Sequence, residues 1–279
     1  MNNIIVLEPS SNLRALGRNA LAGKWKIAIT AVLIYQICVT LPALILDQLF
    51  GKTLAELYGN IYYDNSYGMA SDIVEGISYG AQKISTMSGV YIFLVTGAFT
   101  LGLTIFFINL FRARQLDVAQ VFSGFEQFFK ALGLMFMVGL FTFLWTLLLI
   151  VPGIIAAIRY SQAFFILADD PNKGIMECIN ESKWLMNGNK AKYFCLQLSF
   201  IGWLLLTSFA IAIVSEFFFA FIGGSVMMVV IDWILGLAIC WVTAYMTATD
   251  AAFYDILRGN LRANTKDDSK INTYTPGQF

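Results

Sequence analysis

The chain has 279 residues, of which 58% are hydrophobic and only 13% are charged. Soluble domains carry roughly 45–50% apolar and about 25% charged residues, so this chain has too little polar surface to cover a globule in water. The formal net charge is zero, which argues against a nucleic-acid partner. Histidine, the commonest general base and metal ligand, does not occur. Since no catalytic motif occurs either, we expect a membrane protein with no enzymatic activity, cofactor or metal.

Residues 1–26 are predicted to be a cytoplasmic amphipathic lead-in. Leu13 and Leu16 share one face of a short helix, and Arg14 and Arg18 stand beside that face. A helix of this kind either lies on the inner membrane surface or serves only as the lead-in to the first span.

Residues 27–257 are predicted to form a membrane domain of six helices, because a spanning helix needs about 20 largely apolar residues. The expected spans are 27–50, 88–111, 131–151, 154–168, 193–214 and 225–257. An external loop occupies residues 51–87, and a polar cytoplasmic tail occupies residues 258–279. The predicted fold class is therefore all-α, a polytopic transmembrane helical bundle. The last helix is too long for lipid alone, so its end is expected to project into the cytoplasm.

The fourth span is short and depends on Pro152-Gly153. A helix running unbroken over 131–168 would be about 57 Å long at 1.5 Å per residue, nearly twice the hydrocarbon thickness. Proline and glycine interrupt helices, so the pair predicts a hairpin turn.

The basic residues predict the orientation. Fifteen of the eighteen lysines and arginines fall in segments 1–26, 112–130, 169–192 and 258–279, whereas only Lys52 and Lys83 fall on the opposite side. Because cytoplasmic segments collect lysine and arginine, both termini are predicted to be cytoplasmic.

Arg159 is the most informative single residue, since an ionisable group within a span is a functional-site hypothesis by default. Asp232 in the last helix has a similar predicted depth, so we expect the two to pair or to share a polar cavity. The alternatives are a structural ion pair and a site for a substrate or an ion. Asp250 and Asp255 are interpreted mainly as a solvated helix end, the alternative being a site for cations or for a cytoplasmic partner.

Two further surfaces carry a structural and a functional interpretation each. Small residues at steps of four favour close helix packing, either within the chain or at a dimer face: Gly236, Cys240, Ala244, Ala248 and Ala252. Three lysines near the inner surface suit anionic lipid heads, although the orientation rule alone also explains them: Lys183, Lys190 and Lys192.

Several short motifs are typical of one family. They are Arg14…Arg18…Leu21…Gly23…Trp25, Val151-Pro152-Gly153, Arg159-Tyr160-Ser161, Ala168-Asp169-Asp170-Pro171, Ser182-Lys183, Met186-Asn187-Gly188-Asn189-Lys190, Leu198-Ser199-Phe200-Ile201-Gly202-Trp203 and Ala252-Phe253-Tyr254. With them the chain resembles a bacterial multi-spanning family catalogued as domain of unknown function nine-seventy-five. It also looks like the membrane portion of some bacterial glycerophosphodiester phosphodiesterases, without their catalytic barrel. It departs from the family pattern at Ala244-Tyr245, where a proline-tyrosine pair is usual. The resemblance implies a bacterial inner-membrane location and no established reaction.

We therefore expect a non-enzymatic partner, regulator or accessory factor in the bacterial inner membrane. Its expected partners are membrane lipids and either another membrane protein or a second copy of the chain. The alternative is a transporter or a lipid- or peptide-handling protein that uses a polar site near Arg159 and Asp232. A connected polar cavity that reaches Arg159 favours this alternative.

Overall fold

The computed structural model describes residues 4–6, 8–52, 85–222 and 225–260, and the regular elements of this part of the chain are helices. Most of the predicted external loop and cytoplasmic tail lies outside these residues. The chain divides into two compact units. One comprises Met1–Ile34 and Gly97–Phe279, and the other comprises Tyr35–Thr96.

Five helical segments among the described residues are long and apolar enough to cross a membrane, which confirms the all-α membrane fold. They are α2 (Trp25–Phe50), α5 (Thr86–Phe111), η1 with α6 (Val118–Gln127, Phe128–Leu148), α7 with α8 (Ile150–Tyr160, Ala163–Asp169), and the part of α10 (Lys190–Ile222) that ends at Val214. The sixth predicted span is the helix α11 (Ser225–Leu257), whose side chains before residue 239 are outside the described part.

The smaller unit holds the second part of α2 and the first part of α5. The Asp47 carboxylate accepts hydrogen bonds from the Ser85 backbone N–H at 2.7 Å and from the Ser88 hydroxyl. The Tyr91 hydroxyl donates to the carbonyl of Cys38. A carboxylate is stabilising at a helix N-terminus, where backbone N–H groups lack partners, so Asp47 caps α5 and joins it to α2.

The helices α6 and α7 form a hairpin within the larger unit. The chain reverses at Leu149, whose backbone is extended, so the turn lies three residues before the predicted Pro152-Gly153. Pro152 falls in the first turn of α7, where its missing N–H costs nothing. Gly153 packs directly on Thr146, because a Cβ there would lie 2.9 Å from the Thr146 Cα.

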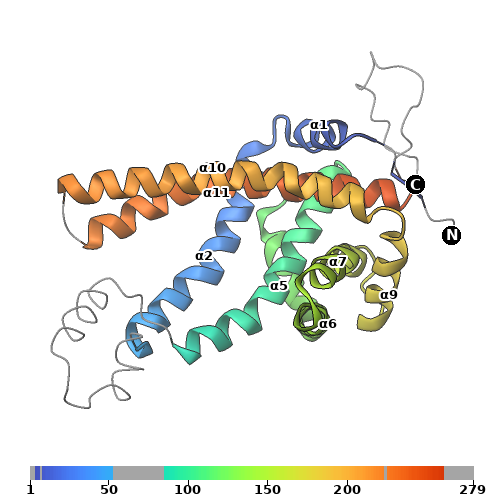
Figure 1. Cartoon of the computed structure of the whole chain (residues 1–279), viewed down its shortest axis with the longest axis horizontal. Helices are drawn as coiled ribbons and strands as arrows, with labels where there is room; N and C mark the ends of the chain where they lie inside the picture. Colours follow the sequence, from blue (N-terminus) through green and yellow to red (C-terminus); the bar gives the residue numbers. More distant parts are fainter. Residues whose placement is uncertain (1–3, 7, 53–84, 223–224, 261–279) are drawn as a thin grey trace. The chain divides into compact units, whose positions relative to one another are not determined.

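The larger unit is dominated by the hairpin of α10 and α11 and by the short helix α1 (Ser10–Leu21) along it (Figure 1). Ile4 approaches Gly259 at one end of α11, and the Tyr245 hydroxyl donates to the Arg14 carbonyl further along. After α1, Trp25 stacks on Trp241, so the chain from Ile4 to Trp25 runs antiparallel to α11 (Figure 1). Gly17 makes the close approach possible, because a Cβ there would lie 2.3 Å from the Thr249 hydroxyl oxygen.

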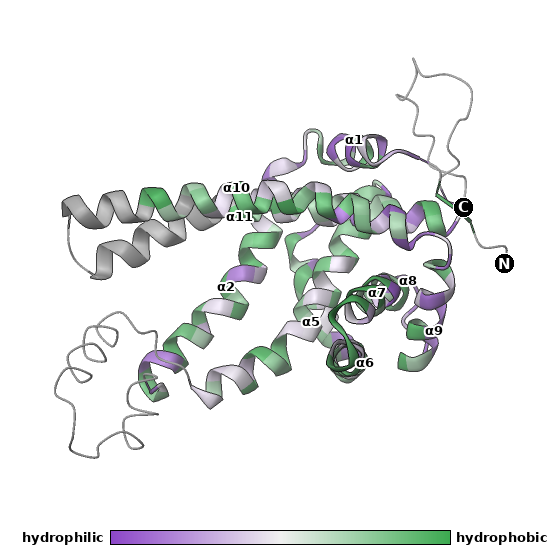
Figure 2. Cartoon of the chain, in the orientation of Figure 1, coloured by the Kyte–Doolittle hydropathy of each residue, from purple (hydrophilic) through white to green (hydrophobic). Residues whose placement is uncertain are grey.

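Polar residues in the larger unit gather in α1 and in α9 (Ile175–Leu185), whereas α6 and α7 are mainly apolar (Figure 2). The tip of the α6–α7 hairpin is strongly exposed although it is apolar: Leu147, Leu148, Leu149, Ile150 and Val151. Water would penalise so large an apolar patch, whereas lipid would not.

Candidate functional site

Arg159 lies in the last turn of α7, and its backbone carbonyl accepts a hydrogen bond from the Ser182 hydroxyl at 2.8 Å. Its Nε is buried and has no hydrogen-bond partner among the described residues. Asp232 is in α11, but its side chain lies outside the described part. The Arg159–Asp232 pair therefore stays a prediction.

Instead of solvated helix ends, the structure shows an ion-pair cluster with three cations and three anions. Its members come from the ends of α5, α8 and α11, from α9 and from the loop before it: Arg112, Asp169, Lys173, Glu181, Asp255 and Arg258. Asp255 is only 2% exposed and accepts from Arg112 at 2.7 Å. The interpretation of Asp255 as a solvated residue is therefore wrong.

The two arginines of this cluster remain charged. Burial alone would lower the pKa of the Arg112 guanidinium, but its hydrogen bonds to Asp255 and Asp169 raise that pKa above its ordinary value. Burial also acts to lower the pKa of Arg258, and its interactions with Tyr254, Glu181 and Asp169 outweigh this effect. Because each anion has a cationic partner, the cluster joins helices and offers no free carboxylate for chemistry.

The small-residue positions of α11 that the structure describes are buried inside the chain: Cys240, Ala244, Ala248 and Ala252. The surroundings of Gly236 lie outside the described part. The helix α11 packs against α1 and α10, so these four positions serve packing within the chain.

The three inner-surface lysines have different surroundings. The Lys183 ammonium lies 5.9 Å from the centre of the Phe141 ring and 5.7 Å from that of Tyr160, and it donates to the side chain of Asn180. Lys190 and Lys192 are half-buried on the first turn of α10.

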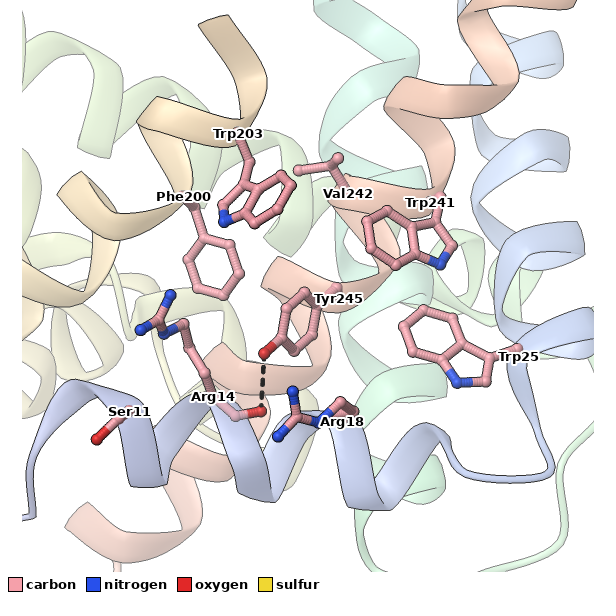
Figure 3. Close-up of a pocket in the computed structure, with 9 residues that line it drawn as sticks. All are labelled: Ser11, Arg14, Arg18, Trp25, Phe200, Trp203, Trp241, Val242 and Tyr245. Atoms are coloured by element: carbon pink, nitrogen blue, oxygen red, sulfur yellow. Dashed lines mark hydrogen bonds between the residues drawn. The ribbon is translucent and has the colours of Figure 1, made fainter. Parts of the chain in front are cut away.

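The structure reveals a pocket that no sequence argument had singled out. It is a hollow of about 490 Å³ between α1, the start of α2, α10 and α11. Aromatic and cationic side chains dominate its lining (Figure 3): Ser11, Arg14, Arg18, Trp25, Phe200, Trp203, Trp241, Val242 and Tyr245. We call these nine residues the arginine–tryptophan pocket.

The aromatic side of the pocket is built by ring contacts. The Trp25 and Trp241 rings are stacked with centroids 5.5 Å apart, and the edge-to-face pair of Phe200 and Tyr245 is 5.2 Å apart. Such pairs stabilise by about 0.5–1.5 kcal/mol beyond their buried area. The pocket nevertheless stays open, since Trp203 is 50% exposed and Trp241 is 43% exposed.

The cationic side of the pocket comes from α1. Arg14 and Arg18 are four residues apart, so they lie on one face of the helix, and Figure 3 shows their guanidinium groups on that face near the Tyr245 hydroxyl. Neither forms an ion pair with a described residue, and the buried Nε of Arg14 lacks an acceptor there. A buried polar group without a partner costs about 1–3 kcal/mol, so the pocket favours an anion.

The sequence predicts only part of the arginine–tryptophan pocket. Arg14, Arg18 and Trp25 share the motif at the start of the chain, and their spacing places both cations on one helix face. The other wall comes from residues about 200 positions later, and no local pattern links Arg14 to Phe200 or Tyr245. The pocket could not be predicted from the sequence, because its two walls are far apart along the chain.

The described part of the chain is helical, has five segments long and apolar enough to cross a membrane, and carries an aromatic and cationic pocket beside its N-terminal helix. The model of the family described as "Protein of unknown function (DUF975)" matches residues 1–158 and 146–261. The chain therefore belongs to this family. No curated protein and no solved structure matches it.

Proposed function

We propose that the protein is a non-enzymatic membrane protein of the bacterial cytoplasmic membrane that binds the phosphate head of an anionic phospholipid in the arginine–tryptophan pocket. One observation carries the proposal. Arg14 and Arg18 face an open aromatic pocket without an acidic partner among the described residues. Phosphate oxygens suit arginine, whose planar donors match phosphate geometry.

Helix lengths support a position at the inner membrane boundary. From Trp203 to Ile222 on α10, and from Ser225 to Ala244 on α11, each helix is about 30 Å long at 1.5 Å per residue, which equals the hydrocarbon thickness. Trp203 and Tyr245 then lie at one boundary, where tryptophan and tyrosine are enriched. The pocket would therefore meet lipid at the level of its headgroups.

The charge pattern supports the inner leaflet. Most basic residues fall on the predicted cytoplasmic side, and anionic lipids of the cytoplasmic leaflet attract lysine and arginine by about 1 kcal/mol each. The roles of partner, regulator and accessory factor are all compatible with a protein that senses or holds lipid. The lipid-handling hypothesis thereby moves from Arg159 to Arg14 and Arg18.

The test compares two double variants of the full chain in dodecyl maltoside. Arg14→Ala with Arg18→Ala removes the pocket cations. Lys24→Ala with Lys26→Ala removes equal charge from residues that do not line the pocket. Tryptophan fluorescence is followed during titration with phosphatidylglycerol, phosphatidylcholine and inorganic phosphate, because Trp25, Trp203 and Trp241 report on the pocket directly.

We expect saturable binding of phosphatidylglycerol, roughly thirtyfold weaker in the arginine double variant, which corresponds to about 2 kcal/mol for two cations. The lysine double variant should bind like the unchanged protein. Equal loss in both double variants would indicate general charge attraction and would overturn the proposal. Equal binding of inorganic phosphate and lipid would show that the pocket selects a free anion and not a lipid.

A further inference from the structure

A buried carboxylate lies in α11 outside both the ion-pair cluster and the arginine–tryptophan pocket. Asp250 is 8% exposed and accepts a hydrogen bond from the side-chain amide of Gln197 at 2.8 Å. Five positions separate it from Tyr245 of the pocket and five from Asp255 of the cluster. It belongs to neither site and makes contacts of its own.

The polar groups around Asp250 converge on the hydroxyl of Tyr193, which is 8% exposed. Tyr193 precedes Gln197 by four residues on α10, so the two share a helix face, and the Tyr193 hydroxyl interacts with Asp250, Gln197 and Ser161, the last in the turn between α7 and α8. Gln162, the next residue in that turn, is fully buried and donates to the Ser161 hydroxyl. The cluster thus joins α11, α10 and the α7–α8 turn through oxygen-bearing side chains.

These surroundings leave the negative charge of Asp250 unbalanced. Its described neighbours are neutral, and no described lysine or arginine forms an ion pair with it. Asp255 pairs with Arg112, and the described cations on the elements packed around Asp250 form no ion pair with it: Arg14, Arg18, Arg159, Lys190 and Lys192. An isolated buried carboxylate is costly enough that it normally acquires a proton or a partner.

Two buried oxygens point to the same conclusion. The side-chain carbonyl oxygens of Gln162 and Gln197 are buried and have no hydrogen-bond donor in the described part of the chain. The amide nitrogen of Gln197 contacts Asp250, so the oxygen of the same amide group is close to the carboxylate. A cation in this cluster would therefore balance the negative charge of Asp250 and bind the side-chain oxygen of Gln197.

We propose that Asp250, Tyr193 and Gln197 form a binding site for a small monovalent cation, a proton or Na⁺, that neutralises the Asp250 carboxylate. Oxygen ligands suit Na⁺ as a hard cation, and a proton on Asp250 would instead donate to an amide or hydroxyl oxygen. This site is independent of lipid binding. It links three helical elements through one neutralised carboxyl group.

The test is infrared spectroscopy of the full chain in dodecyl maltoside, which has no ester carbonyl to obscure the signal. Difference spectra between the unchanged protein and Asp250→Asn are recorded at neutral pH in sodium chloride and in choline chloride. A carboxylic-acid C=O band in both salts identifies a proton. A band in choline that sodium removes identifies Na⁺. Carboxylate bands in choline, with no acid band, would overturn the proposal.

Thermal stability gives a second measurement with a matched control. Asp250→Asn keeps the shape of the side chain and removes a charge that is already neutralised. Its melting temperature should therefore fall much less than that of Asp255→Asn, which removes the anionic partner of Arg112. Both variants are therefore melted in choline chloride, where Na⁺ is absent. An equal or larger fall for Asp250→Asn in that salt would show that Asp250 is ionised and paired with another group of the protein, which contradicts the proposal.

Discussion

The guanidinium of Arg112, directly after α5, holds the carboxylate of Asp255 near the end of α11, with Nη2 and Oδ1 2.7 Å apart. The two residues are 143 positions apart in the chain. The same guanidinium also contacts Asp169 at the end of α8. One side chain thus joins three helix ends, and this makes it the most sensitive position of the ion-pair cluster.

Replacing Arg112 by alanine should destabilise the protein by about 3–5 kcal/mol, because the buried carboxylate of Asp255 then loses its cation and Asp169 keeps only the longer contact with Arg258. Arg114 is exposed, so Arg114→Ala provides a control that removes the same charge. The measurement is thermal unfolding in detergent. Equal melting temperatures for the two variants would show that the cluster does not stabilise the fold.

Replacing Gly17 by alanine should separate α1 from α11, since the added Cβ would lie 2.3 Å from the Thr249 hydroxyl oxygen and 3.0 Å from its backbone. In an open helix the same change would stabilise by about 1 kcal/mol. Gly139→Ala in α6 is the control, because no atom lies within 4 Å of its Cβ position. Hydrogen exchange of residues 10–21 should become faster in Gly17→Ala alone. Unchanged exchange would mean that α1 does not need this close contact.

Replacing Asn189 by alanine should release the chain before α1. Its side chain accepts from the Val6 N–H at 2.8 Å and donates to the carbonyls of Ile4 at 2.8 Å and Leu185 at 2.9 Å. Three hydrogen bonds are therefore lost, two of them to the chain before α1, and the buried Val6 N–H is left without a partner. Such losses cost about 1–3 kcal/mol. Amide exchange at Val6 reports the release, and Asn180→Ala, at an exposed position of α9, should leave that exchange slow.

Two cysteines should differ in labelling by a membrane-impermeant maleimide. Burial raises the pKa of the Cys178 thiol to about 11, and Cys178 is fully buried, so it should stay unlabelled until the protein unfolds. Cys195 is exposed and lies before Trp203, below the proposed membrane boundary. In single-cysteine variants, Cys195 should react in inside-out vesicles and not in right-side-out vesicles. Protection of Cys195 in both would place the boundary nearer to Lys190.

The helices were predictable because each property that defines them is local. Apolar length predicted the spans, and helix-breaking residues predicted a reversal near Pro152. The reversal lies at Leu149 because proline fits the first turn of a helix, so the proline marks where α7 begins. The observed turn thus lies three residues before the predicted one, because proline is tolerated in the first turn of α7.

The candidate sites were predictable only where their residues are neighbours in sequence. Arg14 and Arg18 share a helix face that the spacing predicts, but their pocket requires walls from α10 and α11. Asp255 was misread as solvated because its cation stands 143 positions away. The partners of these polar residues are set by packing between distant parts of the chain, which a single sequence does not predict.

The antiparallel pairing of α1 with α11 has a consequence for biosynthesis. The helix α1 (Ser10–Leu21) leaves the ribosome long before the helix α11 (Ser225–Leu257) that packs against it. At about 5–20 residues per second, the interval between them is roughly 10–45 s. During that time the apolar face of α1, with Leu13 and Leu21, must be sheltered by lipid or by a chaperone, and a chain truncated before α11 would leave it uncovered for its whole lifetime.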